Sequence, residues 1–431
     1  MFGKEILEFS RNLEGLRDFI ELVDAHLEEK NMDALKEDPA AFAPLMLIMS
    51  KHYPDEFELD ETKLERIKNR FGSNIEFIEE EAESGKKFEI KLDEDGQKKF
   101  SSAMEKISKN QSRKSSLHQS SLVTIISYVE WFLAQLIHKY YDKHPDSIGL
   151  KDKQLSLNDL YEIGSIEDAK KYLIDTKVES VLRGSLNDWI KFLKEQMKLS
   201  MSYLDEYQDI LVEACQRRNL YVHNGGVVNS IYLKNCTFKV NKQPDPGEKL
   251  SCDADYIESI LTAFEKTFLL IAAELWKKNE PESEKRFKIL NNMSYEHICN
   301  KRYDIGAALA FFLWGDKGQK ESSRITAQIN YWQAKKWSDD FTEARKDIER
   351  ADFSAKDPLF ILAKHVLLDE FDEAFNLLPD IIRSEKIDLV DIVEWPLFKN
   401  LREQSKFEEI ESEFGLDSNA KGNSEGEANI H

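Results

Sequence analysis

Apolar residues recur at three- and four-residue intervals along most of this 431-residue chain, and this spacing favours α-helices over strands. One wide apolar face falls within residues 117–144, where proline at 145 is expected to end the helix. Its members are Leu122, Ile125, Ile126, Val129, Phe132, Leu133, Leu136, Ile137 and Tyr140. The spacing therefore predicts a mostly α protein.

The strongest helical pattern covers residues 117–280 and predicts a bundle of about four or five helices. A long helix is expected over 202–223, where Gly225 and Gly226 then act as a C-terminal stop. Another apolar helix is expected over 253–278.

The first 116 residues are predicted to form a separate N-terminal helical region that carries a small β-hairpin near 74–92. The segments Asn-Ile-Glu-Phe and Lys-Phe-Glu-Ile-Lys-Leu alternate polar and apolar residues on either side of Ser84-Gly85. The polar run 108–116 is interpreted as a domain boundary. The alternative is a solvated helix surface that continues without a break.

Residues 285–414 are predicted to form helical hairpins. Three similar helix starts begin near Tyr303, Phe341 and Phe371, and their alanines, Ala307, Ala344 and Ala374, lie 37 and 30 positions apart. These distances bracket the period of about 34 residues found in tetratricopeptide repeats, which the region weakly resembles. Generic helix hairpins remain the alternative. The tail, 415–431, has almost no apolar residues and is expected to be disordered.

Composition narrows the classes of function. With 60 basic and 81 acidic residues, the net charge of −21 argues against broad contact with nucleic-acid phosphates. The four cysteines are scattered and form no CxxC pair, which favours a reduced, cytoplasmic protein without a structural metal site. The apolar runs near 40–49 and 267–273 are shorter than a membrane span, so no membrane association is expected. No Walker loop or HExxH motif is present, and no cofactor is expected.

One short motif carries chemistry. Asn219 and His223 are four residues apart and share a helix face, and Arg218 precedes Asn219 on the same broad side. Histidine changes charge near neutral pH and suits proton transfer, whereas arginine is permanently cationic and binds phosphate oxygens. Together with a ribose 2′-hydroxyl, these groups are sufficient for metal-independent RNA cleavage.

The run Arg218-Asn219-x-x-x-His223, at the end of a long helix in a small bundle, resembles the signature of HEPN domains (higher eukaryotes and prokaryotes nucleotide-binding). The resemblance covers roughly 117–280. It implies an all-helical endoribonuclease that forms a homodimer, with two copies of the motif facing each other in one composite site. Members of this family occur as toxins of toxin–antitoxin pairs and as effectors of anti-phage defence, and catalytically dead members also exist.

Two further residues are predicted to support the site. Glu130 interrupts an otherwise apolar row and is expected either to contact Arg218 inside the bundle or to lie half-exposed at the edge of that row. Tyr221 either stacks on a base or packs in the fold. Arg217 fits a looser spacing to His223, but it lacks the following asparagine and is expected to be exposed.

The sequence thus favours a metal-independent endoribonuclease whose catalytic residues are Arg218, Asn219 and His223. Its expected products are a 2′,3′-cyclic phosphate and a 5′-hydroxyl, and its expected partners are RNA, a second copy of the chain, and an antitoxin or trigger protein at the C-terminal hairpins. The alternative is an inactive HEPN scaffold whose helical repeats bind a protein partner.

Overall fold

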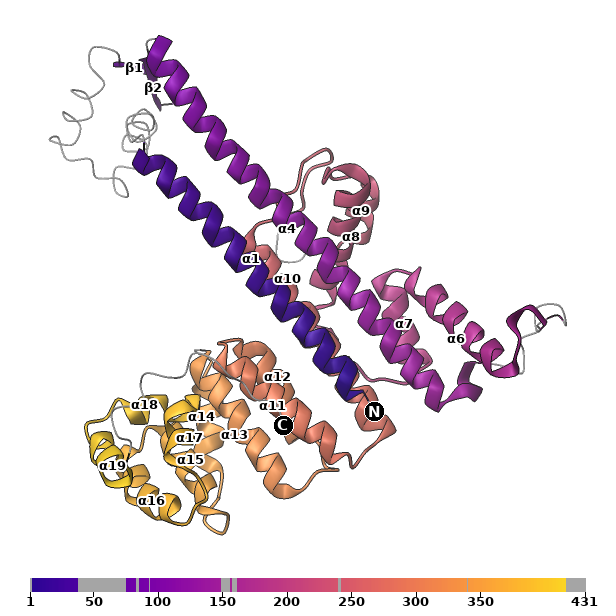
Figure 1. The fold of residues 1–431 in the computed structure, drawn as a ribbon, viewed down its shortest axis with the longest axis vertical. Helices are drawn as coiled ribbons and strands as arrows, with labels where there is room; N and C mark the ends of the chain where they lie inside the picture. The colour runs from indigo at the N-terminus through magenta and orange to yellow at the C-terminus, as the bar shows by residue number, and fades with distance from the viewer. Residues whose placement is uncertain are drawn as a thin grey trace. The chain divides into compact units, whose positions relative to one another are not determined.

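The computed structural model describes residues 2–37, 75–82, 85–92, 94–148, 156, 161–238, 242–338 and 340–415. Helices dominate these residues, which confirms the predicted mostly α fold (Figure 1). The predicted disordered tail falls almost wholly outside the described residues.

The chain divides into two compact units. The first contains Met1–Ser10, Tyr128–Cys215 and Ser259–His431, and the second contains Arg11–Ser127 and Gln216–Glu258. Four helices contribute residues to both: α1 (Gly3–Glu37), α4 (Glu94–Lys143), α8 (Gln208–Asn224) and α10 (Ala254–Asn279). This division differs from the predicted order of an N-terminal region, a bundle and a repeat region.

The predicted β-hairpin is confirmed in the second unit. Strand β1 (Ile75–Ala82) pairs antiparallel with β2 (Gly85–Leu92), from Ile75 opposite Leu92 to Ala82 opposite Gly85. Among the described residues this is the whole sheet. Helix α9 (Ser230–Asn235) also belongs to this unit.

The predicted domain boundary at 108–116 falls inside α4, which runs through it without interruption. The run contains no glycine or proline, and the helix lies beside α1 there (Figure 1). Its polar side chains bind α1. The Asn110 amide donates to Asn31 over 2.7 Å, and the Lys114 ammonium lies 2.8 Å from a carboxylate oxygen of Glu28. The polar run is thus one side of a helix pair.

The N-terminal helix is likewise no separate region, because its first turns enter the core of the first unit. The ring of Phe9 stacks on Phe132 of α4 at 4.2 Å, and both side chains are fully buried. The Ser10 hydroxyl donates to the buried carboxylate of Glu265 on α10 over 3.0 Å. The remaining elements before α10 are α6 (Ile166–Leu182), α7 (Leu186–Glu195) and short 3-10 turns at Pro145–Ile148 and Ser202–Leu204. Helix α4 ends at Lys143, as the proline at 145 predicted.

The C-terminal helices also belong to the first unit. They are α11 (Glu284–Cys299), α12 (Tyr303–Trp314), α13 (Glu321–Trp337), α14 (Thr342–Arg350), α15 (Pro358–Leu368), α16 (Phe371–Arg383), α17 (Leu389–Glu394), a 3-10 turn (Pro396–Phe398), α18 (Lys399–Arg402) and α19 (Phe407–Phe414). Helices α12, α14 and α16 begin at or next to the three predicted starts. From α11 to α16, successive helices pack against each other, and α13 also packs on α15. Their assignment to tetratricopeptide repeats stays a prediction.

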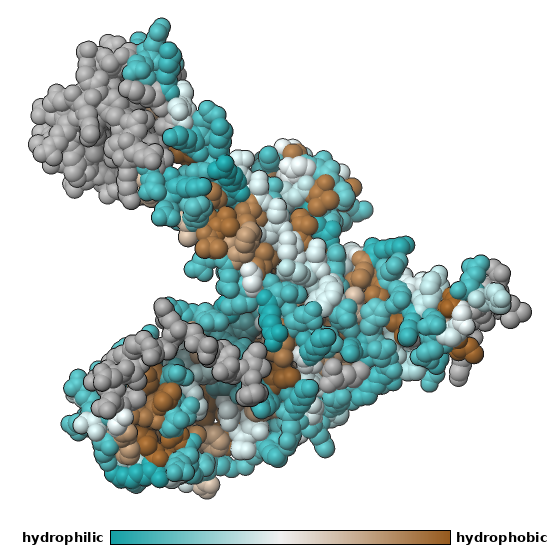
Figure 2. Space-filling view, viewed as in Figure 1, coloured by the Kyte–Doolittle hydropathy of each residue, from teal (hydrophilic) through white to brown (hydrophobic). Residues whose placement is uncertain are grey.

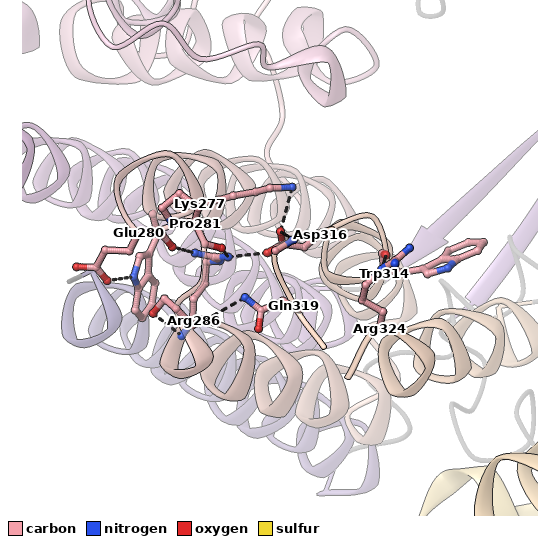
Figure 3. Close-up of polar contacts among 11 residues, drawn as sticks. Lys277, Glu280, Pro281, Arg286, Trp314, Asp316, Gln319 and Arg324 are labelled. Atoms are coloured by element: carbon pink, nitrogen blue, oxygen red, sulfur yellow. Dashed lines mark hydrogen bonds and ion pairs between the residues drawn. The ribbon is translucent and has the colours of Figure 1, made fainter. Parts of the chain in front are cut away.

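A buried ion pair joins α11 to the loop after α12 (Figure 3). The guanidinium of Arg286 lies 2.6 Å from the carboxylate of Asp316, and both side chains are inaccessible to solvent. Arg286 also donates to the carbonyls of Glu280 and Pro281, and the Lys277 ammonium lies 3.3 Å from Asp316. These contacts compensate the loss of hydration that burial imposes on both charges.

The apolar stretch of α4 was not considered as a membrane span in the sequence analysis. Among the described helices, α4 is the one that is long and apolar enough to cross a membrane by length and composition, and half of that window is buried in the structure. A core helix of a soluble protein meets the same criterion. The absence of a membrane association therefore stays a prediction.

We predict that Phe9→Ala lowers the free energy of unfolding by about 3–5 kcal/mol, because it leaves a cavity against Phe132. Urea denaturation followed by circular dichroism measures the change. Phe19→Ala is the matched control, since Phe19 lies on the same helix with 53% of its surface exposed, and about 0.5 kcal/mol or less is expected there. Equal effects would contradict the placement of Phe9 in the core.

We also predict that Asp316→Asn costs about 3–5 kcal/mol, because the Arg286 guanidinium keeps its charge in a buried site without a compensating carboxylate. Thermal unfolding compared with Glu284→Gln tests this. Glu284 pairs with Lys320 over 2.7 Å at side chains that are about three-quarters exposed, so its loss should change stability little. A small effect for Asp316→Asn would refute the buried pair.

Candidate functional site

The residues of the predicted motif lie on the last two turns of α8, within the second unit. The helix ends where Gly225 and Gly226 adopt left-handed backbone angles, with φ of +59° and +80°. The Gly226 amide donates to the Leu220 carbonyl over 3.0 Å, which satisfies one of the last free carbonyls of the helix. The predicted glycine stop is confirmed.

The end of α8 is anchored to the segment just before α10. The Leu250 amide donates to the Gly226 carbonyl over 3.0 Å, and the Tyr221 hydroxyl donates to the Leu250 carbonyl over 3.1 Å. The side-chain amide of Asn224 donates to the carbonyl of Val227 over 2.6 Å. These bonds hold the last turn in one position, and they give Tyr221 a packing role, one of its two predicted roles.

The three predicted catalytic side chains differ in exposure. Arg218 and Asn219 are half-buried, whereas His223 is exposed at the end of the helix. The motif thus combines a histidine open to solvent with an arginine and an asparagine seated closer to the fold.

Arg217 does not match its predicted exposure. It is half-buried, its guanidinium donates to the Ser251 carbonyl over 2.7 Å, and it lies 4.1 Å above the ring of Tyr256. These contacts tie α8 to the start of α10. They give Arg217 a structural role, and the choice of Arg218 as the arginine of the motif stays a prediction.

Glu130, the other residue that is predicted to support the site, is half-buried on α4. It belongs to the first unit and Arg218 to the second. Their predicted contact therefore stays a prediction.

Two clefts, both in the first unit, were not predicted from the sequence. One, of about 820 Å³, is lined by residues of α10, α12, α13 and the segment 200–206, and the other, of about 310 Å³, lies among α11, α13 and α15. Their lining residues are dispersed over more than one hundred positions and form no motif. The sequence contained one sign of the larger cleft. Lys266, Leu270 and Glu274 are spaced to share one face of α10.

We predict that Gly226→Ala destabilises the protein by about 1–3 kcal/mol more than Gly225→Ala, as measured by urea denaturation. Both changes strain a left-handed residue by about 1–2 kcal/mol. At Gly226 a Cβ atom would also lie 2.7 Å from the Tyr221 ring, whereas at Gly225 nothing lies within 4 Å. Equal losses would show that Tyr221 does not pack on this turn.

Neither a metal site nor a comparison with known proteins adds to the evidence for this candidate site. In the part of the chain that the structure describes, no group of three or more histidine, cysteine, aspartate or glutamate side chains is placed to hold a metal ion. No family model, curated protein or solved structure matches the chain. The argument for function therefore rests on the residues at the end of α8.

Proposed function

We propose that the protein is a metal-independent endoribonuclease of the HEPN type, and that it acts as a toxin or anti-phage effector. The observation that carries the proposal is the end of α8. There, His223 is exposed beside a rigid glycine turn, and Arg218 and Asn219 precede it on the same helix.

The chemistry follows from the three side chains. His223 accepts the proton of a ribose 2′-hydroxyl, whose oxygen attacks the adjacent phosphorus, and a histidine in the protonated form donates a proton to the leaving 5′-oxygen. Arg218 stabilises the added negative charge on the phosphorane, and Asn219 helps to position the phosphate. The products are a 2′,3′-cyclic phosphate and a 5′-hydroxyl.

A single copy offers one histidine for two proton transfers, and a second copy supplies the other. Two exposed apolar side chains near the motif favour an interface between copies: Val222 on α8 is 51% exposed, and Ile231 on α9 is 64% exposed. Figure 2 shows apolar side chains among hydrophilic ones over α9. Covering them would remove this surface from water.

The acidic balance shapes the kind of ribonuclease that we propose. A chain of net charge −21 repels RNA over most of its surface, so binding depends on the local charge of the two arginines in a composite site. Such an enzyme binds RNA weakly and is selective or regulated. The C-terminal helices are the proposed place for an antitoxin or trigger protein.

We predict that His223→Ala and Arg218→Ala each reduce cleavage of single-stranded RNA in EDTA by about a hundredfold or more, because each removes a group that acts in the transition state. Gel separation of a labelled RNA measures the rate, and circular dichroism checks the fold.

Arg217→Ala and His26→Ala are the matched controls. Arg217 neighbours the motif but binds Ser251 and Tyr256, and His26 is exposed on α1. Both variants should keep cleavage within a few-fold of the unaltered protein. Full activity in His223→Ala and Arg218→Ala would end the ribonuclease proposal.

The alternative, an inactive scaffold that binds a protein partner, has one observation in its favour. The cleft of about 310 Å³ is lined by alternate helices of the C-terminal region, α11, α13 and α15. It presents the side-chain amides of Asn291, Asn292, Asn330 and Gln333 beside apolar side chains, and amides can bond the backbone of a peptide. Absence of RNA cleavage in the unaltered protein would favour this alternative.

A further inference from the structure

The larger cleft, of about 820 Å³, has the size of a small-molecule site. One face of α10 forms its floor, with Lys266, Leu270, Glu274, Lys277 and Lys278 at helical spacing. Lys266 and Lys278 lie twelve residues apart, which corresponds to about 18 Å along the helix. The four lysines and three acidic residues that line the cleft give it a positive balance in a strongly acidic chain.

Two of these lysines have neutral hydrogen-bond partners. The Lys266 ammonium donates to the Tyr207 hydroxyl over 2.7 Å, and the Lys278 ammonium donates to the carbonyls of Met197 and Lys198 over 2.7 and 3.2 Å. Among the described residues, neither forms an ion pair with a carboxylate. Neutral partners position both ammonium groups without cancelling their charge.

The carboxylate that lies between them is already engaged. Glu274 accepts hydrogen bonds from the backbone amides of Ser200 and Met201 and from the Tyr203 hydroxyl, over 2.6, 3.3 and 2.9 Å. Burial and this carboxylate raise the pKa of Tyr203, so its hydroxyl remains a donor. Lys277 is held by the buried Asp316 (Figure 3). The charged groups on the floor of the cleft are therefore held in fixed positions.

The part of the cleft that α12 and α13 form is aromatic. Phe311 on α12 is 58% exposed, an unusual state for a phenylalanine, and its ring centre lies 5.4 Å from that of Tyr331 on α13. Ala307 and Ala308, one turn earlier on α12, leave room beside it. The cleft thus offers an open aromatic face and cationic groups along one helix.

We propose that this cleft binds a nucleoside phosphate, with the base stacked on Phe311 and the phosphates held by Lys266. Stacking of a base on an aromatic side chain contributes about 1–3 kcal/mol, and lysines bind phosphate as point charges. The ligand is either a free nucleotide or the phosphorylated end of an RNA. The site is distinct from the motif on α8.

Isothermal titration calorimetry of the full chain, carrying His223→Ala so that RNA stays intact, tests the proposal. The probes are ATP, GTP and a 5′-phosphorylated hexaribonucleotide, each in EDTA. We expect at least one to bind with a dissociation constant below about 1 mM, and Phe311→Ala and Lys266→Gln each to weaken it about tenfold.

Tyr172→Ala and Lys317→Gln are matched controls, because both side chains are exposed outside the cleft, and they should leave affinity unchanged. Tighter binding of the mononucleotides identifies a free nucleotide as the ligand, and binding of the hexanucleotide alone identifies an RNA end. Lack of binding by all three probes would overturn the proposal, as would equal affinity in Phe311→Ala, Lys266→Gln and the controls. Neither result bears on RNA cleavage by the motif.

Discussion

The burial of α10 is the constraint on which the first unit depends. This helix is apolar around most of its circumference, and such a helix is stable only when others cover it on several sides. Its buried apolar residues in this unit are Ile260, Leu261, Ala263, Phe264, Phe268, Leu269, Leu270, Ile271, Ala272, Ala273, Leu275 and Trp276. The N-terminal segment covers one side through Phe2 and Ser10. The loop after α12 reaches the helix through Asp316, which binds both Lys277 of α10 and Arg286 of α11. The first ten residues are thus needed to complete a core that begins more than two hundred residues later.

Much of this fold could be predicted, because helical periodicity and turn chemistry are local. The mostly α class, the hairpin, the end of α4 and the glycine stop of α8 all follow from residues within one or two turns. The pairing of α1 with α4 could not be predicted, since Asn110 and Lys114 have the composition of a solvated surface and their partners lie about eighty positions earlier. Arg217 was placed wrongly for the same reason, because Ser251 and Tyr256 are distant in sequence.

The candidate sites differ in how visible they are in the sequence. The motif on α8 is compact, so its residue types and spacing show it directly, and the structure adds its anchoring by Tyr221 and Gly226. The cleft gathers residues from four segments, and only the fold brings Phe311 next to the lysines of α10. At the motif on α8 and in the cleft, positive charge is confined to a few side chains. This arrangement suits an acidic protein that recognises phosphate at defined points and not along its surface.

The central proposal is that Arg218, Asn219 and His223 cleave RNA through the ribose 2′-hydroxyl. Mass spectrometry of the fragments formed in EDTA tests it most directly, with a second RNA of the same sequence in which every 2′-hydroxyl is methylated. The proposal predicts 2′,3′-cyclic phosphate and 5′-hydroxyl ends from the first RNA and no fragments from the second. Fragments with 3′-hydroxyl and 5′-phosphate ends, or cleavage of the methylated RNA, would contradict it.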